Sequence, residues 1–376
     1  MRIGITCYPT YGGSGIVATE LGMELASRGH EVHFISYANP IRLDPGTPRI
    51  HYHEVEVSTY PLFQYPPYCL ALASRMADVA ESYELDLLHV HYAVPHSISA
   101  LLAQQMLASR RRLPFVTTLH GTDITLVGSD ESYFSITKFS IERSNGVTSV
   151  SEDLRRRTVH VFGIAGEIRV IPNFVNCDIY HPDDAKTGAG AYAPPGEKLL
   201  LHVSNFRPVK RVVDCIRILA EVRKNEPAHL LMAGDGPDRA AAEHLAHQLK
   251  VERHVTFLGK QDHVERLIPL AHVLLLPSEL ESFGLAALEA MACGVVPVAT
   301  RVGGVPELIT HGEDGFLEEV GDIAGQARRV LSLLTDDALH YRMAKAGRWN
   351  AAERFCAEKI ISQYENFYRE VIHAEA

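Results

Sequence analysis

The sequence lacks the signals that mark secreted, membrane-spanning and disulfide-linked proteins. No secretory signal opens the chain, because residues 1–7 run directly into an expected strand. The longest run without Asp, Glu, Lys or Arg covers residues 87–109, and its histidines and glutamines exclude a membrane span. A cytoplasmic protein with free thiols is therefore expected. The six cysteines form no CxxC pair and are Cys7, Cys69, Cys177, Cys215, Cys293 and Cys356.

Net positive charge is also lacking. The chain has 36 basic and 46 acidic residues, which gives a formal net charge of −10. This balance argues against general nucleic-acid binding, although a local basic site for a small anion remains compatible with it. At 376 residues, of which 46% are hydrophobic, the chain is long enough for two domains with separate cores.

Short apolar runs alternate with helical patterns from end to end, which is typical of parallel α/β proteins. A helix is expected over residues 15–28, where Val17, Leu21 and Leu25 recur at helical spacing before Gly29. The expected strands of the first half are 2–7, 31–37, 50–57, 86–91, 114–120, 146–150 and 168–171, and those of the second half are 199–204, 229–233, 255–258, 273–276 and 295–299.

The alternation of expected strands and helices starts again after residues 172–176, which we interpret as a domain junction. We expect one domain over 1–172 with a returning C-terminal helix at about 355–376, and a second domain over 173–354. The tail pattern predicts a helix over 351–372, and residues 183–196 predict an exposed loop rich in Ala, Gly and Pro. Two such domains would face each other across a cleft at the carboxyl edges of their sheets.

Two carboxylates stand eight positions apart near the end of the second half. Glu281 follows the expected strand 273–276 and Glu289 lies within an expected helix over 285–293. A loop with Gly284 ahead of a helix N-terminus is where α/β folds bind anionic ligands. The pair could accept hydrogen bonds from sugar and ribose hydroxyls, act as a hydrolytic acid and base, or be ordinary helix charges. Because a buried charge in so apolar a helix needs a hydrogen-bond partner, a functional role is favoured for Glu289.

Basic residues and glycine turns follow the other strands of the second half. Arg207, Lys210 and Arg211 come just after a buried strand, where guanidinium and ammonium groups suit a diphosphate. Gly234 opens a glycine-rich turn, and Leu258 with Gly259 ends a strand whose backbone could contact a nucleobase. Taken singly, the cation motif could also be a solvated helix start, and the glycine motifs are more typical of structural turns.

The first half offers a glycine loop and a histidine motif. Gly13 and Ser14 open the first helix, where a turn or an anion site would fit, but neither a GxGxxG nor a Walker motif occurs. His120 ends a strand. His89 and His91 alternate on another strand, but no acid or thiol completes a metal site. Since no Asp-x-Asp motif occurs, the usual carboxylate bridge to a metal-bound nucleotide diphosphate is missing.

These motifs in this order resemble the family 4 retaining glycosyltransferases of GT-B fold, over essentially the whole chain. The resemblance implies two Rossmann-like domains with parallel sheets facing a central cleft. It rests on Gly12-Gly13, His120-Gly-Thr-Asp123, Arg207 with Lys210, Gly234-Asp-Gly236, Glu281 with Glu289, and Gly303-Gly-Val-Pro-Glu307. The opening residues 2–15 and the segments 89–96 and 118–124 resemble more narrowly the members of that family in the bacillithiol pathway.

The narrower resemblance implies UDP-N-acetylglucosamine as the donor, L-malate as the acceptor and no metal requirement or other cofactor. Arg207 and Lys210 would neutralise the diphosphate, Glu281 would bind the donor sugar, Glu289 the ribose, and His120 would face the anomeric carbon. The interval between Arg207 and Lys210 is shorter than in many relatives. Arg211 could therefore take the role of second cation in place of Lys210. The implied donor-binding set is Gly13, Asn205, Arg207, Lys210, Gly234, Leu258, Gly259, Glu281, Phe283, Gly284, Leu285 and Glu289.

Malate is a small dianion, so its site calls for cations, hydroxyls and backbone N–H groups. Ser14, Tyr92, Thr118 and Arg143 are the candidates in the first domain. We expect no nucleic-acid or membrane partner, and a homodimer is one oligomeric state to test. Three alternatives stay open: a family member with another acceptor, a GT-B sugar-nucleotide epimerase, and a two-domain protein that binds an anion without catalysis.

Overall fold

The computed structural model describes residues 1–44, 46–57, 65–128, 130–183 and 188–374. The chain divides into two compact units, Met1–Pro172 with Ile360–Ala376 and Asn173–Lys359. The chain leaves the first unit after Pro172 and returns to it at Ile360, within the C-terminal helix Ala357–His373. Residues 184–187 of the expected loop lie outside the described residues.

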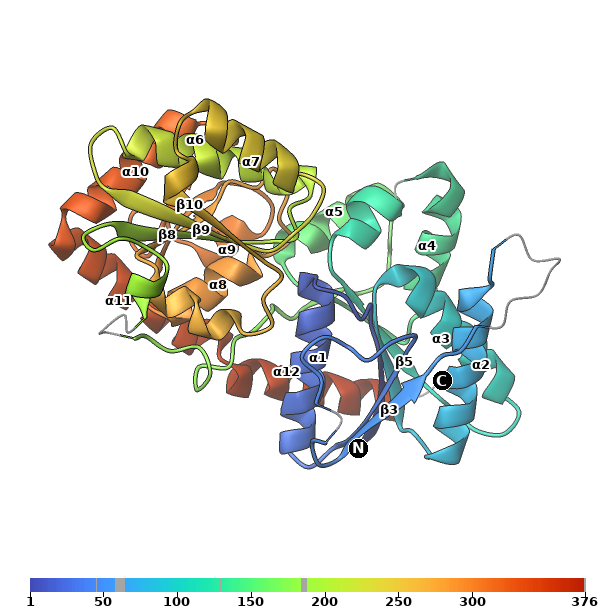
Figure 1. Cartoon of the computed structure of the whole chain (residues 1–376). Helices are drawn as coiled ribbons and strands as arrows, with labels where there is room; N and C mark the ends of the chain where they lie inside the picture. Colours follow the sequence, from blue (N-terminus) through green and yellow to red (C-terminus); the bar gives the residue numbers. More distant parts are fainter. Residues whose placement is uncertain (45, 58–64, 129, 184–187, 375–376) are drawn as a thin grey trace. The chain divides into compact units, whose positions relative to one another are not determined.

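The first unit is built on a seven-stranded parallel sheet (Figure 1). The strand order β3-β2-β1-β4-β5-β6-β7 reverses direction between β1 and β4, as in doubly wound folds. The strands are β1 (Arg2–Thr6), β2 (Glu31–Ser36), β3 (Ile50–Glu54), β4 (Leu87–His91), β5 (Phe115–Leu119), β6 (Gly146–Ser149) and β7 (Arg169–Val170), and the helices are α1 (Gly13–Ser27), α2 (Tyr68–Ser82), α3 (Ile98–Leu107), α4 (Glu131–Arg143), α5 (Glu152–Phe162) and α12 (Ala357–His373).

The two faces of β4 carry different side chains because successive residues of a strand point to opposite sides. Leu88 and Val90 belong to the apolar core under α2 and α3. His89 points to the other face, where its ring lies 5.5 Å from that of Tyr368 on α12. The alternation of His89 and His91 in the sequence therefore marks one face of a buried strand.

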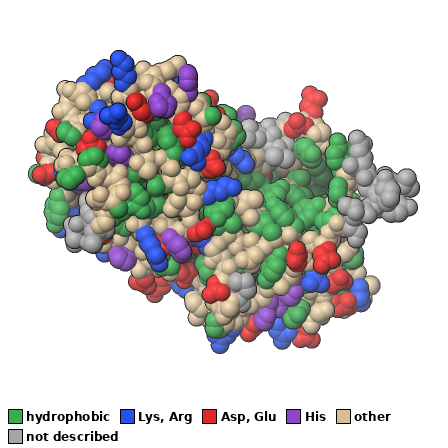
Figure 2. All heavy atoms as spheres, in the orientation of Figure 1, with side chains coloured by type: hydrophobic (Ala, Val, Ile, Leu, Met, Phe, Trp, Pro, Cys, Tyr) green, Lys and Arg blue, Asp and Glu red, His purple; other side chains and the backbone are tan. Residues whose placement is uncertain are grey.

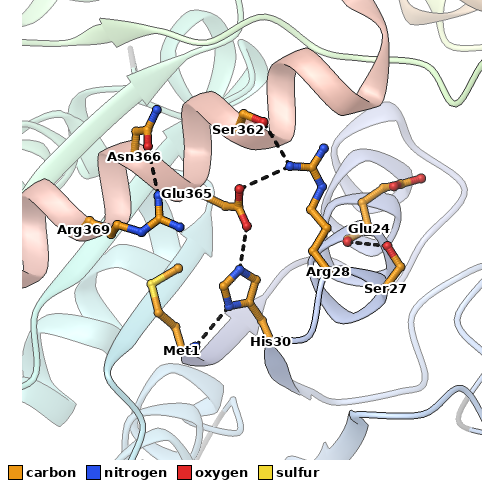
Figure 3. Close-up of polar contacts among 9 residues, drawn as sticks. All are labelled: Met1, Glu24, Ser27, Arg28, His30, Ser362, Glu365, Asn366 and Arg369. Carbon is orange, nitrogen blue, oxygen red and sulfur yellow. Dashed lines mark hydrogen bonds and ion pairs between the residues drawn. The ribbon is translucent and has the colours of Figure 1, made fainter.

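Polar contacts fix α12 to the first unit (Figure 3). The Glu365 carboxylate accepts a hydrogen bond from Arg28 at 3.2 Å, at the end of α1. It also contacts His30 Nε2 at 2.7 Å, and His30 Nδ1 lies 3.0 Å from the amino group of Met1. One carboxylate of the returning helix thus ties together the segments that flank the first two strands.

The second unit has a six-stranded parallel sheet of order β10-β9-β8-β11-β12-β13, which reverses between β8 and β11. Helices α6 and α7 lie on one side of the β8 to β10 strands and α8 on the other (Figure 1). The strands are β8 (Lys198–Val203), β9 (Ala228–Ala233), β10 (Val255–Gly259), β11 (Val273–Leu276), β12 (Val296–Thr300) and β13 (Phe316–Glu318), and the helices are α6 (Val212–Val222), α7 (Arg239–Gln248), α8 (Leu285–Ala292), α9 (Val305–Leu308), α10 (Ile323–Thr335) and α11 (Asp337–Phe355).

The predicted α/β architecture with two Rossmann-like sheets is confirmed, and every expected strand is present within a few residues of its expected ends. The three-residue strand β13 was not predicted. The expected continuous helix over 351–372 is wrong, because α11 and α12 are separated at Cys356. The Phe355 carbonyl accepts from Val175 N at 3.0 Å and Ala357 N donates to the Val175 carbonyl at 3.0 Å, which breaks the helical pattern.

Surface charge is mixed on the face shown in Figure 2, where Lys and Arg side chains alternate with Asp and Glu. Among the described residues, no helix is long and apolar enough to cross a membrane.

Candidate active site

The loops after β8 and β11 meet where the sheet of the second unit reverses its order. Lys210 Nζ donates to Glu281 Oε1 at 2.6 Å, and Ser278 Oγ donates to the same oxygen at 2.9 Å. The backbones are also joined, since Glu279 N donates to the Val209 carbonyl at 2.8 Å. The carboxyl ends of strands beside such a reversal are the usual ligand site of α/β sheets. The structure thus brings two of the predicted site residues into direct contact.

The three cations of this loop, Arg207, Lys210 and Arg211, differ in their ion-pair partners. Arg211 Nε donates to Asp214 Oδ2 at 2.6 Å, and that buried carboxylate also accepts from Arg217. Arg207 is exposed and precedes the short helical turn Pro208–Lys210. Within the described part of the chain, no hydrogen bond or ion pair involves the Arg207 guanidinium. Arg211 therefore fixes the start of α6, whereas Arg207 is available to an anion.

A glycine turn packs directly against this loop. A Cβ atom on Gly234, whose φ is 130°, would lie 1.8 Å from the Ser204 carbonyl oxygen, so only glycine fits. Gly234 N donates to the Gly259 carbonyl at 2.8 Å, and Gln261 Nε2 donates to the Leu258 carbonyl at 2.8 Å. The ends of β8, β9 and β10 thus form one layer of closely packed backbone.

Asn205 lies inside that layer. Its Oδ1 is buried and has no hydrogen-bond partner among the described residues. A buried amide oxygen without a partner is costly in a folded protein, which makes it a candidate for a ligand contact.

The helix α8 begins directly behind Glu281. Gly284 precedes the helix with φ of 97°, and Leu285 is its first residue. The Phe283 ring is 3% exposed and its centroid lies 5.5 Å from that of Phe355, so this side chain belongs to the core. Phe283 can therefore offer a ligand only its backbone, and the backbone N–H groups of Gly284 and Leu285 stand at the helix N-terminus, which the helix dipole favours for anions.

Glu289 lies on α8 and is only 4% exposed. Tyr180 Oη donates to Glu289 Oε1 at 2.9 Å, and Tyr180 itself is 3% exposed. Sequence reasoning missed Tyr180, because it lies in an irregular segment 109 residues before its partner. The predicted separation of the two acids is observed: Glu281 stands in the strand-to-helix loop and Glu289 inside the helix.

In the first unit, the residues that follow β1 and β4 lie close together. The rings of Tyr8 and Tyr92 are 5.2 Å apart, and Tyr8 also contacts His96 at 4.6 Å. Gly13 is exposed and Ser14 partly exposed at the start of α1. The Tyr92 hydroxyl is hydrogen-bonded to Thr122. Gly13, Ser14 and Tyr92 thus lie at the carboxyl edge of this sheet, as predicted for an anion site.

His120 is held by a buried histidine and a buried carboxylate. Its Nε2 lies 2.8 Å from His91 Nδ1. Its backbone N–H donates to Asp123 Oδ1 at 3.2 Å, and Gly121 N donates to the same oxygen at 2.8 Å. Burial lowers the pKa of His120 to about 3 and drives that of His91 well below its usual value, so both rings are neutral at pH 7.

Burial has the opposite effect on Asp123. It raises the pKa of this carboxyl to about 6, although backbone N–H groups, Gly121 first among them, oppose the shift. Asp123 closes the His120-Gly-Thr-Asp123 segment on itself and so determines where His120 points. The sequence placed Asp123 in a recognised segment but gave no reason to treat it as a positioning group.

Two acceptor candidates are not placed with the others. The Thr118 hydroxyl is fully buried and bonded to Thr148 Oγ1 and His89 Nε2, both at 2.6 Å, so it cannot reach a soluble ligand. Arg143 is the last residue of α4, just before β6, and its guanidinium lies 5.2 Å above the Phe139 ring. It therefore lies at the amino edge of the sheet, opposite Ser14 and Tyr92, because a crossover helix returns the chain to that edge.

His89 is not available as a metal ligand. Its Nε2 bonds to Thr118 and its Nδ1 lies 2.7 Å from the Tyr368 hydroxyl, so both ring nitrogens are engaged.

Both halves of the chain match glycosyltransferase family models. The model described as Glycosyltransferase Family 4 matches residues 11–179, and the one described as Glycosyl transferases group 1 matches residues 190–349. The chain is 49% identical over 373 residues to the N-acetyl-alpha-D-glucosaminyl L-malate synthase of Bacillus anthracis, covering 99% of this chain and 97% of that protein. The chain belongs to the family 4 glycosyltransferases. It is also 30% identical over 302 residues to a glycogen synthase of Mycobacterium tuberculosis, covering 76% of this chain and 69% of that one.

Solved structures give this glycosyltransferase the same fold. The sucrose-phosphate synthase of Thermosynechococcus elongatus superposes with a TM-score of 0.81 at 24% identity, covering all of both chains. The Anabaena protein HepE, solved with UDP-glucose, superposes with a TM-score of 0.82 at 20% identity, covering 98% of this chain and 100% of the other. The predicted GT-B fold is confirmed.

Proposed function

We propose that this glycosyltransferase moves N-acetylglucosamine from UDP-N-acetylglucosamine to the hydroxyl of L-malate with retention of the α configuration, as a step of bacillithiol synthesis. The observation that carries the proposal is the 49% identity to the Bacillus anthracis synthase over 99% of the chain. The contacts of the described residues are compatible with a role for several of the proposed groups.

Arg207 and Lys210 would neutralise the diphosphate of the donor. The exposed Arg207 guanidinium offers a planar fork to two phosphate oxygens, and Lys210 adds a compact charge at the same strand end. Both candidates for the second cation are paired at 2.6 Å, and Lys210 is preferred, because its partner Glu281 belongs to the proposed donor site, whereas Arg211 pairs with the fully buried Asp214. Cations that stabilise a leaving group as its charge develops supply much of the rate enhancement of such reactions.

The two acids would hold opposite ends of the donor. Glu281 shares its carboxylate between Lys210 and Ser278, so a sugar hydroxyl bound there would be linked to the phosphate-binding cation. Glu289 would accept from the ribose hydroxyls, with Tyr180 fixing the orientation of its carboxylate. Neither acid needs to titrate in this scheme.

The reaction breaks the bond between the anomeric carbon and the β-phosphate oxygen and forms one to the malate hydroxyl oxygen. The malate proton passes to the departing β-phosphate on the same face, so no covalent sugar–enzyme intermediate is required. His120 would face the anomeric carbon with its ring or its carbonyl oxygen. A neutral imidazole suits this position, because an imidazolium would repel the positive charge that develops on the sugar.

The acceptor would bind in the first unit at the start of α1. Gly13 and Ser14 present helix N-terminal N–H groups, which favour a carboxylate, and the Tyr92 hydroxyl lies at the same sheet edge. Thr118 and Arg143 are not included, for the reasons of burial and position given above. No metal is assigned to the transfer, since the proposed diphosphate ligands are cations and no Asp-x-Asp motif occurs in the sequence.

Mass spectrometry of the purified protein with UDP-N-acetylglucosamine and L-malate tests the proposal. We expect N-acetylglucosaminyl malate and UDP to appear together, in equal yield with and without EDTA. A sugar-nucleotide epimer formed without malate would instead support an epimerase. Absence of the malate glycoside, with UDP released only in the presence of another acceptor, would overturn the acceptor assignment.

A further inference from the structure

Three metal-binding side chains converge at the amino edge of the second sheet, away from the proposed donor site. Glu197 directly precedes β8, His229 is the second residue of β9, and His254 directly precedes β10. These strands are neighbours in the sheet and run parallel, which places their amino ends together (Figure 1). Each of the three strands therefore contributes one residue, at or next to its amino end.

The spacing of the three side chains fits a small divalent cation. His254 Nδ1 lies 3.1 Å from Glu197 Oε1, and His229 Nδ1 lies 3.4 Å from Glu197 Oε2. One potential ligand atom from each residue lies within 4.8 Å of the others. Ligands at about 2.0–2.1 Å from a tetrahedral zinc ion are separated from one another by about 3.3 Å. The His229 Nδ1–Glu197 Oε2 distance of 3.4 Å is close to that value.

The facing atoms are otherwise unsatisfied. Glu197 Oε2, His229 Nδ1 and His254 Nδ1 are buried and make no hydrogen bond with any described residue. His229 as a whole is 5% exposed. The two imidazoles thus face the Glu197 carboxylate at ion-pair distance without hydrogen-bond geometry, and a cation shared by the three side chains would satisfy all of them.

The surrounding contacts hold the ligand atoms in place. His229 Nε2 lies 2.8 Å from Thr256 Oγ1, a bond that leaves Nδ1 facing Glu197. Arg223 Nη1 donates to Glu197 Oε1 at 2.8 Å, so Oε2 is the oxygen left for an ion. Support of this kind, through the second ring nitrogen and the second carboxylate oxygen, is usual around protein-bound zinc.

We propose that Glu197, His229 and His254 form a site for a transition-metal ion of the zinc class, with a solvent molecule as its fourth ligand. Two imidazoles and one carboxylate suit Zn²⁺ better than Mg²⁺ or Ca²⁺, which prefer oxygen ligands. The ion would cross-link the amino ends of β8, β9 and β10. Since β8 has six residues, the site lies roughly 20 Å from the cations at the other end of that strand and takes no part in the transfer.

Calorimetric titration of EDTA-treated protein with ZnCl₂ tests this site, and the absorption spectrum with CoCl₂ reports its geometry. We expect one Zn²⁺ per chain, intense visible Co²⁺ bands typical of a tetrahedral site, and no response to MgCl₂. His254→Gln should weaken Zn²⁺ binding at least about 100-fold, since losing even a supporting group costs 10–100-fold.

His263→Gln is the matched control. His263 Nδ1 pairs with Glu265 at 3.0 Å in the same unit, but the His263 side chain is 68% exposed and the pair is not part of a three-residue cluster among the described residues. This variant should bind Zn²⁺ like the parent. Equal Zn²⁺ binding by parent and His254→Gln, or none by the parent, would overturn the proposal.

Glu197→Gln provides a second variant with little change of volume, and circular dichroism verifies its fold. Zn²⁺ should raise the Tm of the parent but not of Glu197→Gln, and a folded Glu197→Gln that keeps the Tm response would also overturn the site. Stoichiometry and Tm are read without substrates, so they stand apart from the test of the proposed transfer.

Discussion

Lys210 and Glu281 are 71 residues apart in the sequence, and their charged groups are 2.6 Å apart in the fold. Their side chains are 22% and 11% exposed, so the pair is partly shielded from water. Lys210 follows β8 and Glu281 follows β11, the two strands between which the sheet reverses its order. The proposed phosphate-binding cation and the proposed sugar-binding acid are thus parts of one polar group.

Arg207→Ala should reduce turnover by about 10²–10³-fold, because it removes a preorganised cation from the leaving group. The fold should be unaffected, since Arg207 is exposed. Steady-state kinetics with UDP-N-acetylglucosamine and L-malate measure the effect. Arg266→Ala, with a side chain 78% exposed in the same unit, is the control and should retain full activity. Unchanged turnover of Arg207→Ala would contradict the assignment.

Glu281→Gln removes the negative charge of this side chain and keeps its size, so it tests whether the charge itself is needed. The amide oxygen can still accept hydrogen bonds from Ser278 and Lys210, but it carries no charge and so forms no ion pair with the Lys210 ammonium. We expect kcat/KM for the donor to fall by about 10²-fold, the scale of one lost polar contact in a transition state. Glu265→Gln serves as the control because Glu265 pairs with His263 outside this group. Equal kcat/KM values for Glu281→Gln and the parent would exclude a role in donor binding.

Tyr180→Phe should weaken UDP binding and destabilise the protein by about 1–3 kcal/mol, since it removes a donor from a carboxylate that is 4% exposed. Titration calorimetry with UDP and urea unfolding give the two quantities. Tyr341→Phe, at a tyrosine 69% exposed, should change neither. A loss of stability with normal UDP affinity would leave Glu289 a structural role only.

Acid should destabilise the first unit through its buried histidines. Burial lowers the pKa of His89 to about 3 and that of His96 to about 4, against an unfolded value of 6.5. Below pH 6.5 the unfolded chain binds protons that the folded chain does not, so the free energy of unfolding falls as the pH falls toward 4. Asp123, with its raised pKa, works in the opposite direction and offsets about one histidine.

Urea unfolding at pH 7, 6 and 5 checks this expectation. With His120 also at about 3, the slope should exceed the roughly 1.4 kcal/mol per pH unit of a single group. His96→Gln should reduce the slope, whereas His373→Gln, at a histidine on the exposed end of α12, should not. Stability independent of pH between 7 and 5 would contradict the inferred neutrality of these rings.

The order of strands and helices could be predicted because burial on both faces makes each parallel strand a short apolar run. The point at which each apolar run stops also predicts the end of a strand. For this reason the sequence assigns Arg207, His120 and Glu281 to loops at sheet edges. The three-residue strand β13 could not be found this way, since its pairing with β12 and not its composition makes it a strand. The break at Cys356 depends in the same way on a partner, Val175, 181 positions earlier in the chain.

The sequence by itself determined the α/β architecture and the residue types at the strand ends, because periodicity and local turn chemistry are properties of neighbours in the chain. Only the tertiary structure decided which of those residues meet. It joined Lys210 to Glu281 and Tyr180 to Glu289, buried Thr118, and placed Arg143 at the amino edge of its sheet. It also gathered Glu197, His229 and His254, whose separation along the chain hides a cluster that depends on strand order alone.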